Sequence, residues 1–425
     1  MSSNNEKIEA VSGNDGTNVL TIYMFLTNTV LLLTLLPFNL SKMPMRRQYF
    51  IEFFVIFIGS LTVLTVCHKA YWVVLIALLS WCYSTKNQFL PPKSDPLANQ
   101  NSKTKNLASL TIFRAYCMML SIICILAVDF PAIFPKYFTK TETFGFSLMD
   151  VGVGIIIFGS GASFGFSNRI KSSWSDYLQV FLLIFIGCIR MITVRSLEYH
   201  QHFSEYGIHW NFFFTLAIIN LVKELFLRKV NSSSIGVLFS VLVMLAYEYK
   251  LSNGLEEFIM TARHEGDFWQ MNREGICSTI GYLSIFSLSS SYSKQFIKNS
   301  TEKIQVQNLA IASLASGLTF FLYELVFGKT SRRLANTGYV LWMCSLCFYC
   351  WLLISLCCLR LPKLPKILAG LNKHQFYVFL LANLITGAVN IKIDTLKQNA
   401  VNAFGIMTLY LLVLCTFIIL TRMSR

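Results

Sequence analysis

Apolar segments of about 20 residues follow one another along almost the whole chain, and this pattern constrains the fold most. A helix of that length crosses about 30 Å of hydrocarbon, whereas the strands of a membrane barrel alternate apolar and polar residues. Of the 425 residues, 54% are hydrophobic and only 13% are charged, about half the charged share of a soluble domain. The sequence therefore predicts an all-α polytopic membrane protein and argues against a soluble enzyme.

Thirteen segments are candidate transmembrane spans, of which the third and the ninth are short and flanked by polar residues. They cover residues 19–38, 48–67, 70–84, 108–128, 147–166, 175–194, 209–228, 233–250, 276–292, 306–327, 335–357, 374–391 and 402–421. We expect a polar tail (1–18), one transmembrane domain (19–421) with linkers at 85–107 and 251–275, and a short C-terminal tail (422–425). The first eighteen residues lack a basic region, so the first span is expected to be an uncleaved anchor.

The distribution of Lys and Arg predicts the orientation. Connections after odd-numbered spans carry more of these residues than the others, and basic loops stay in the cytoplasm. The N-terminus is therefore predicted to be lumenal and the C-terminus cytosolic. The net charge of +15 does not indicate a nucleic-acid partner, because the basic residues form no continuous stripe. Three glycosylation sequons, at Asn39, Asn231 and Asn299, fall on the predicted cytosolic side.

The twelve cysteines lie within or beside the apolar segments. Cys344, Cys347 and Cys350 have a spacing seen in metal sites. They lie inside an apolar run, however, without a second cysteine pair or a nearby histidine. This context favours a lipid-facing or packed helix over a zinc site, and the sequence predicts no cofactor.

The connection between the fourth and fifth spans holds several ionisable residues. Asp129 is followed by Pro131 and Pro135 and then by Lys140 and Glu142. The prolines predict the end of a helix and a shaped re-entrant loop. An Asp can act as general base toward an alcohol, and a Lys can stabilise a developing oxyanion. The alternative is an interfacial ion pair with a snorkelling lysine.

Asp150 lies at the start of the fifth span, where an unpaired charge would be costly. Arg114 in the fourth span is the expected partner, in a structural ion pair or, less readily, in a substrate contact. Glycines that follow Asp150 in the same span predict close packing of neighbouring helices.

The connection before the seventh span is rich in histidine and aromatic residues. His200 and His202 diverge on a helix, which argues against a metal site. His209, followed by Trp210 and Asn211, begins an aromatic run at the predicted membrane interface. These residues either anchor the chain at the interface or contact a substrate headgroup, with His209 as base or hydrogen-bond donor.

Paired arginines, Arg332 and Arg333, stand close to Asn336 in a connection on the less basic face. Their position opposes the orientation trend, so an anionic phosphate group is an attractive partner for them.

The twelfth span carries polar residues on one helical face. Asn383, Thr386, Gly387 and Asn390 follow the spacing i, i+3, i+4 and i+7. A polar stripe inside hydrocarbon must face protein or a cavity, so it serves helix packing or substrate binding.

Residue chemistry alone leaves more than one function open. The sequence has no GxSxG elbow, phosphate-binding loop or HExxH motif. A lipid-modifying enzyme and a lipid or solute transporter, each with a lumen-side polar site, both fit the pattern, as does a structural subunit of an assembly.

Five blocks of sequence, in order, resemble the GPI inositol acyltransferases (PIG-W-type; in fungi, GPI-anchored wall transfer protein). The resemblance runs from about residue 108 to 395, and the first hundred residues resemble the family in hydropathy alone. A possible extra residue between Pro131 and Pro135 departs from the family pattern and would shift Lys140 slightly. The blocks are Arg114–Gly154, Glu205–Phe214, Asn272–Ile276, Ser331–Asn336 and Leu381–Asn390.

The resemblance implies a multi-pass enzyme of the endoplasmic reticulum membrane. Such an enzyme moves a fatty acyl chain, typically palmitoyl, from acyl-CoA as co-substrate to the inositol 2-hydroxyl of glucosaminyl-phosphatidylinositol. It further implies that Asp129 and Lys140 form the catalytic pair. A membrane-bound O-acyltransferase with a catalytic histidine would instead use His209. The oligomeric state is not indicated.

Overall fold

The computed structural model describes residues 12–37, 39–85, 102–196, 206–230, 232–261, 267–361 and 363–423. Within these ranges the regular elements are helices, and one isolated β-bridge pairs Gly16 with Phe146. The all-α class expected from the sequence is confirmed.

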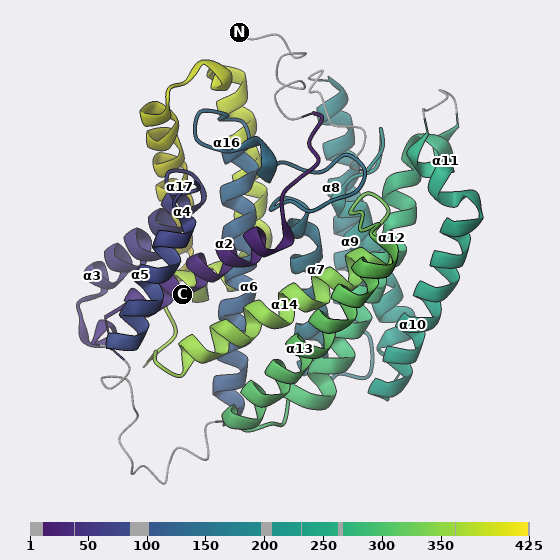
Figure 1. Cartoon of the computed structure of the whole chain (residues 1–425), viewed down its shortest axis with the longest axis horizontal. Coiled ribbons are helices and arrows are strands. Elements are labelled where there is room, and N and C mark those ends of the chain that lie inside the picture. The colour runs from purple at the N-terminus through teal and green to yellow at the C-terminus, as the bar shows by residue number, and fades with distance from the viewer. Residues whose placement is uncertain are drawn as a thin grey trace.

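Helices occur at all thirteen segments predicted as spans (Figure 1). They are α2 (Val19–Leu31) with η1 (Leu32–Leu35), α3 (Met45–Glu52) with η3 (Phe53–Ile58) and α4 (Gly59–Leu64), α5 (Tyr71–Ser84), α6 (Ser102–Ala127), α7 (Val151–Phe166), α8 (Trp174–Ser196), α9 (Phe212–Val222) with η7 (Lys223–Leu227), α10 (Ser233–Lys250), α12 (Phe268–Tyr292), α13 (Glu302–Phe327), α14 (Thr337–Cys358), α16 (Gln375–Lys392) and α17 (Ala400–Met423).

Among the described residues, seven helices are long and apolar enough to cross a membrane, or up to eight if a bent pair counts as one span. That pair is α15 (Lys366–Lys373) and α16, which meet at an angle of 89°. Three further apolar helices are shorter, namely Val19–Leu35, Tyr71–Ser84 and Val151–Phe166. The count of thirteen crossings and the orientation remain predictions.

Short helical elements fill several connections. They are η2 (Leu40–Lys42), η6 (Lys136–Phe138), η8 (Leu251–Leu255), α11 (Glu256–Met260), η9 (Ser293–Ile297) and η10 (Thr395–Lys397). Much of the predicted linker 251–275 is therefore helical, since η8 and α11 extend α10 and α12 begins at Phe268. The sequence predicted a linker here because polar residues interrupt the apolar ones. In the structure, however, Leu251 and Ile259 are buried.

Helix α12 holds the ninth predicted span, and protein encloses it. The helix packs against α7 and α10, and its serines Ser284, Ser287 and Ser289 are buried. A Cβ added at Gly161 of α7 would lie 2.4 Å from the Phe286 carbonyl oxygen. The expectation that glycines of this span allow close helix approach is thus confirmed, as is usual where helices pack within a membrane.

Helix α14 runs through the core, where both of its tryptophans are fully buried. Cys344, Cys347 and Cys350 are buried on the same helix as free thiols, which matches the expected packed helix. Helices α8 and α13 instead expose apolar side chains such as Phe181, Phe185, Leu318 and Leu325, as a lipid-facing surface would.

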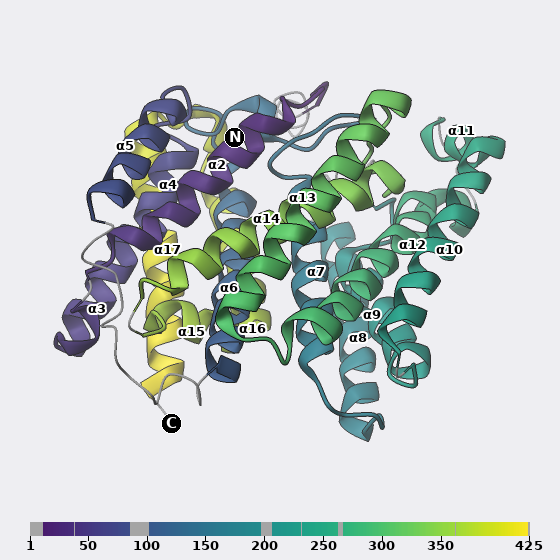
Figure 2. The same ribbon diagram turned by 60° about the horizontal axis from the view of Figure 1, so that its bottom comes forward.

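The described ends of the chain lie at opposite ends of the helix bundle. Near the N-terminus, Thr17 N–H donates to the Phe146 carbonyl in the loop between α6 and α7 (2.7 Å). Near the C-terminus, Arg422 donates to the Lys366 carbonyl at the start of α15 (2.8 Å). Figure 2 shows α17 leading to the C-terminus, away from the loop between α6 and α7. An odd number of crossings requires such an arrangement.

This arrangement predicts that the sequons at Asn39 and Asn299 carry no glycan. Helix α2 begins beside the α6–α7 loop, which Thr17 contacts, and α12 begins beside the connection of Arg333, which also contacts that loop. Asn39 and Asn299 follow the other ends of these helices, at the opposite, predicted cytosolic end. Asn231 lies outside the described residues. Glycosidase treatment should leave the protein's mass unchanged, whereas Glu6→Thr, which creates a sequon at Asn4 in the predicted lumenal tail, should add a removable glycan. A removable glycan on the unaltered chain would contradict the topology.

Candidate active site at the loop between α6 and α7

The loop that follows α6 carries Asp129 close to the polar stripe of α16. Asn390 Nδ2 donates to Asp129 Oδ2 at 2.7 Å, and α16 packs against α6. On the same stripe Thr386 is buried, while Asn383 Nδ2 bonds the Phe379 carbonyl of its own helix (2.7 Å). The expectation that this stripe faces protein or a cavity therefore holds for Thr386 and Asn390, and the contact between Asn390 and Asp129 links two of the predicted blocks.

Aromatic side chains anchor the loop between Asp129 and Lys140. Phe130, Phe134 and Phe138 are buried, and the Phe138 ring packs edge-on against Phe25 of α2, with a centroid distance of 4.7 Å. Helix α6 ends just before the prolines, as the sequence predicts. The loop therefore has a fixed apolar underside, and Asp129 and Lys140 both keep partial exposure.

Asp150 organises the second half of the loop. This fully buried carboxylate accepts from Arg332 Nε (2.7 Å), Thr141 Oγ1 (2.8 Å) and Ser147 Oγ (2.8 Å). The prediction that Arg114 pairs with Asp150 was wrong. The actual ion pair joins residues 182 positions apart, a contact that neighbouring spans do not reveal.

The connection before α14 holds the other edge of the loop. Gly145 N–H donates to the Thr330 carbonyl (3.0 Å), and Ser331 Oγ donates to the Thr143 carbonyl. Asn336 caps α14 by accepting from Tyr339 N–H (3.2 Å). Arg332 thus holds this loop in place through Asp150, and Asn336 shapes the connection that contacts the loop.

The N-terminal segment 12–17 covers this loop, a contact that sequence reasoning missed. Asn14 Nδ2 donates to the Thr139 carbonyl and Gly13 N–H donates to Glu142 Oε1, each at 2.6 Å. Gly16 and Gly145 both have positive φ, and a Cβ on Gly145 would lie 2.5 Å from the Asp15 carbonyl oxygen. These glycines were the available signal, because only glycine permits this backbone approach without strain.

Backbone contacts hold the block around His209 against α12. Asn272 Oδ1 accepts from the backbone N–H groups of His209 and Trp210 (both 2.8 Å). Asn211 caps α9 through Phe213 N–H (3.1 Å). His200 and His202 lie outside the described residues.

Arg333 belongs to the same region of the structure as α12. Its guanidinium pairs with Glu274 Oε1 at 2.9 Å and also donates to the Ile259 carbonyl at 3.1 Å. Both paired arginines therefore meet carboxylates of the protein, Asp150 and Glu274.

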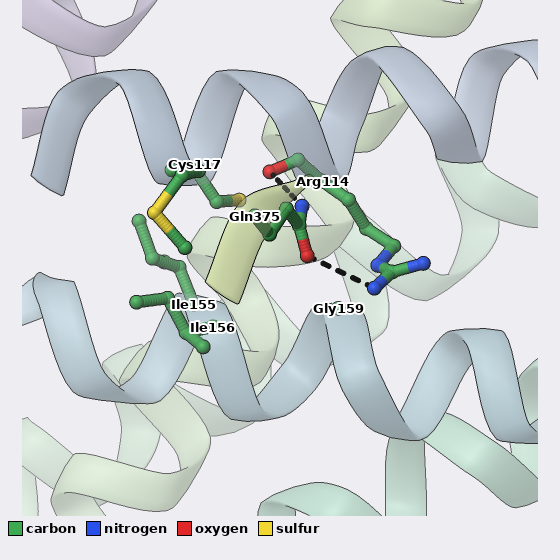
Figure 3. A pocket seen from close by; sticks show the side chains of 7 residues that line it. Arg114, Cys117, Ile155, Ile156, Gly159 and Gln375 are labelled. Atoms are coloured by element: carbon green, nitrogen blue, oxygen red, sulfur yellow. Dashed lines mark hydrogen bonds between the residues drawn. The ribbon is translucent and has the colours of Figure 1, made fainter. Parts of the chain in front are cut away.

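Arg114 borders a small pocket between α6, α7 and the start of α16 (Figure 3). Its guanidinium donates to Gln375 Oε1 (2.9 Å), and Gln375 Nε2 donates to the Arg114 carbonyl (3.0 Å). The pocket is lined by Arg114, Cys117, Met118, Ile155, Ile156, Gly159 and Gln375.

Comparison with known proteins gives a consistent result. The family model GWT1 matches residues 3–421. The phosphatidylinositol-glycan biosynthesis class W protein of Dictyostelium discoideum is 30% identical, over 97% of this chain and 96% of its own. GPI-anchored wall transfer protein 1 is 32% identical in Kluyveromyces lactis (88% of this chain, 86% of its own) and in Schizosaccharomyces pombe (75% and 72%). The chain therefore belongs to the GWT1 family.

Proposed function

We propose that this protein is an O-acyltransferase of GPI-anchor biosynthesis in the endoplasmic reticulum membrane. It transfers a fatty acyl chain, palmitoyl by family resemblance, from acyl-CoA to the inositol 2-hydroxyl of glucosaminyl-phosphatidylinositol. The observation that carries the proposal is the loop between α6 and α7. It presents Asp129 and Lys140 from a backbone that three separate parts of the chain hold in place.

In the proposed reaction, Asp129 accepts the proton of the inositol hydroxyl as its oxygen attacks the thioester carbonyl carbon. Lys140 stabilises the oxyanion of the tetrahedral intermediate. Collapse of this intermediate breaks the carbon–sulfur bond. The proton held by Asp129 passes to the leaving sulfur, and the products are the acylated inositol lipid and CoA thiol.

The surroundings of Asp129 support the role of a base. The Asn390 amide fixes the direction of its carboxylate through Oδ2, and the partial exposure of Asp129 leaves it accessible. Cys124, five residues before Asp129, is a buried thiol of α6. This burial favours direct transfer to the hydroxyl over an acyl-cysteine intermediate at that position.

The proposal is tested with purified protein, labelled acyl-CoA and glucosaminyl-phosphatidylinositol. Acyltransferase activity predicts a labelled, inositol-acylated lipid and one free CoA thiol per transfer. A transporter, the alternative function, would move a lipid or solute between vesicle compartments without consuming acyl-CoA. Transport without thioester cleavage would therefore overturn the proposal.

Replacing Lys140 with Ala should lower kcat by about 10²–10³-fold, the usual effect of removing an oxyanion stabiliser. Lys140→Arg should keep part of the activity, because it retains the positive charge. His209→Ala is the matched comparison and should have a much smaller effect, since His209 is held at α12 through its backbone. The opposite ranking, with His209→Ala inactive and Lys140→Ala active, would support a histidine-dependent O-acyltransferase.

A further inference from the structure

Arg114 is a charged residue inside an apolar span. Within the described part of the chain, its guanidinium pairs with no carboxylate. It lies seven residues into the apolar segment Leu107–Ala127, about 10 Å from one end of that segment. A cation at this depth is costly and marks a candidate functional site. Arg332 and Arg333 differ from it, because each of them has a carboxylate partner.

The hydrogen bonds of Arg114 leave donor capacity unused. A guanidinium has five N–H donors, and within the described residues its side chain donates to Gln375 Oε1 alone. The side chain is partly exposed. Figure 3 shows Arg114 and Gln375 joined directly by their two hydrogen bonds at the edge of the pocket, with Ile155 and Ile156 on its α7 side. A planar cation with free donors in a small apolar pocket suits an oxyanion such as phosphate.

Two features of the neighbouring backbone favour the same ligand. Helix α16 begins at Gln375, just beyond the 89° bend, and no side chain caps its first turn. The start of a helix carries partial positive charge and free N–H groups, and broken helices use such ends to hold anionic groups within membranes. In α7, Gly159 leaves room for Arg114, because an added Cβ would lie 3.2 Å from Arg114 Cγ.

We propose that the pocket formed by Arg114, Gln375 and Gly159 binds a phosphate group of the acyl donor. This inference rests on the proposed acyltransferase function. Arg114 lies fifteen residues before Asp129, which corresponds to about 22 Å along α6. In the inositol lipid the phosphate is attached next to the hydroxyl that is acylated, so it cannot reach this pocket while that hydroxyl is at Asp129. In acyl-CoA a long pantetheine arm separates the thioester from the phosphates.

The position of the pocket also suggests a route for the donor. Arg114 lies nearer the end of α6 that is opposite the Asp129 loop. A donor whose phosphates bind at Arg114 would enter from that end and extend its thioester through the bundle toward Asp129. The acceptor lipid would meet the thioester at the end that holds the loop.

The test compares two acyl donors with the same acyl chain, acyl-CoA and the acyl-pantetheine thioester, which has no phosphate. Arg114→Gln should reduce the preference for acyl-CoA, expressed as the ratio of kcat/KM values, by about 10–100-fold, as expected for loss of a charged hydrogen bond. Arg114→Lys should give an intermediate preference. Arg190→Gln, which removes a cation from α8, is the matched control and should leave the preference unchanged.

Two outcomes would overturn the assignment. In one, Arg114→Gln leaves the donor preference unchanged. In the other, the substitution raises KM for the inositol lipid instead of for acyl-CoA, which would give the phosphate to the acceptor. If Arg114→Gln fails to fold, Gly159→Ala provides a second route, because it crowds the Arg114 side chain without removing its charge. It should reduce the same preference.

Equilibrium binding separates this inference from the proposed function. The probe is a thioether analogue of acyl-CoA, which cannot transfer its acyl chain, and its affinity should fall about 10–100-fold in Arg114→Gln. If Arg114→Gln binds the analogue more weakly but the unaltered protein transfers no acyl chain, the phosphate site is retained and the proposed function is rejected. If the unaltered protein transfers the acyl chain and Arg114→Gln binds the analogue as tightly as the unaltered protein does, the phosphate site alone is rejected.

Discussion

Asp129→Asn is expected to lower kcat/KM for acyltransfer by about 10²–10⁴-fold, the usual contribution of a general base. The substitution removes the basic oxygen but keeps the size of the side chain and an oxygen that can accept from Asn390. The protein should therefore fold normally and keep its affinity for the thioether analogue. Steady-state kinetics on purified protein, with thermal melts alongside, measures both expectations.

Asp394→Asn is the matched control for this experiment. Asp394 follows α16, close in sequence to Asn390, and pairs with Lys397 at 3.3 Å. Its replacement should change activity little, because this surface ion pair is worth at most about 1 kcal/mol. Full acyltransfer by Asp129→Asn, or an acyl group trapped on a cysteine, would refute the assignment of Asp129 as the base.

Arg332→Met is expected to destabilise the protein by about 3–5 kcal/mol, the usual cost of leaving one member of a buried ion pair unpaired. The fully buried Asp150 would keep its hydroxyl donors but lose the compensating charge. Loss of this anchor should also loosen the loop that carries Lys140. Because large membrane proteins often unfold irreversibly, the measurement is the shift in melting temperature at a fixed heating rate.

Two further variants define the origin of this loss. Asp150→Asn combined with Arg332→Met removes both charges and should recover part of the stability, since the unpaired carboxylate is gone. Lys329→Met breaks an exposed pair with Glu256 and should cost at most about 1 kcal/mol. Equal losses for Lys329→Met and Arg332→Met would contradict the anchoring role of Arg332.

The local elements were predictable from the sequence because they depend on neighbouring residues. Apolar segments located the helices, and the prolines after Asp129 located the end of α6. The spacing of Thr386 and Asn390 placed a polar face on α16 that meets protein. Each of these features depends on a single stretch of chain and on the helical period.

The contacts that assemble the site were not predictable in the same way. Arg114 was the cation nearest to Asp150 among those inside predicted spans, yet Arg332 supplies the ion pair from a distant connection. The N-terminal segment read as a polar tail, because its contacts with Thr139 and Glu142 use mostly backbone and amide groups. Pairing across more than a hundred residues depends on how helices pack, and composition does not encode it locally.

The long-range ion pair has a consequence for biosynthesis. During translation the ribosome makes Asp150 well before Arg332, its partner 182 residues further on, and Asn390 follows later still. A nascent chain that ends before the connection preceding α14 has a loop with Asp129 and Lys140 but lacks the cation that neutralises Asp150. The site thus matures only when most of the protein has been synthesised, and a prematurely terminated chain is expected to be inactive and to be a substrate for membrane quality control.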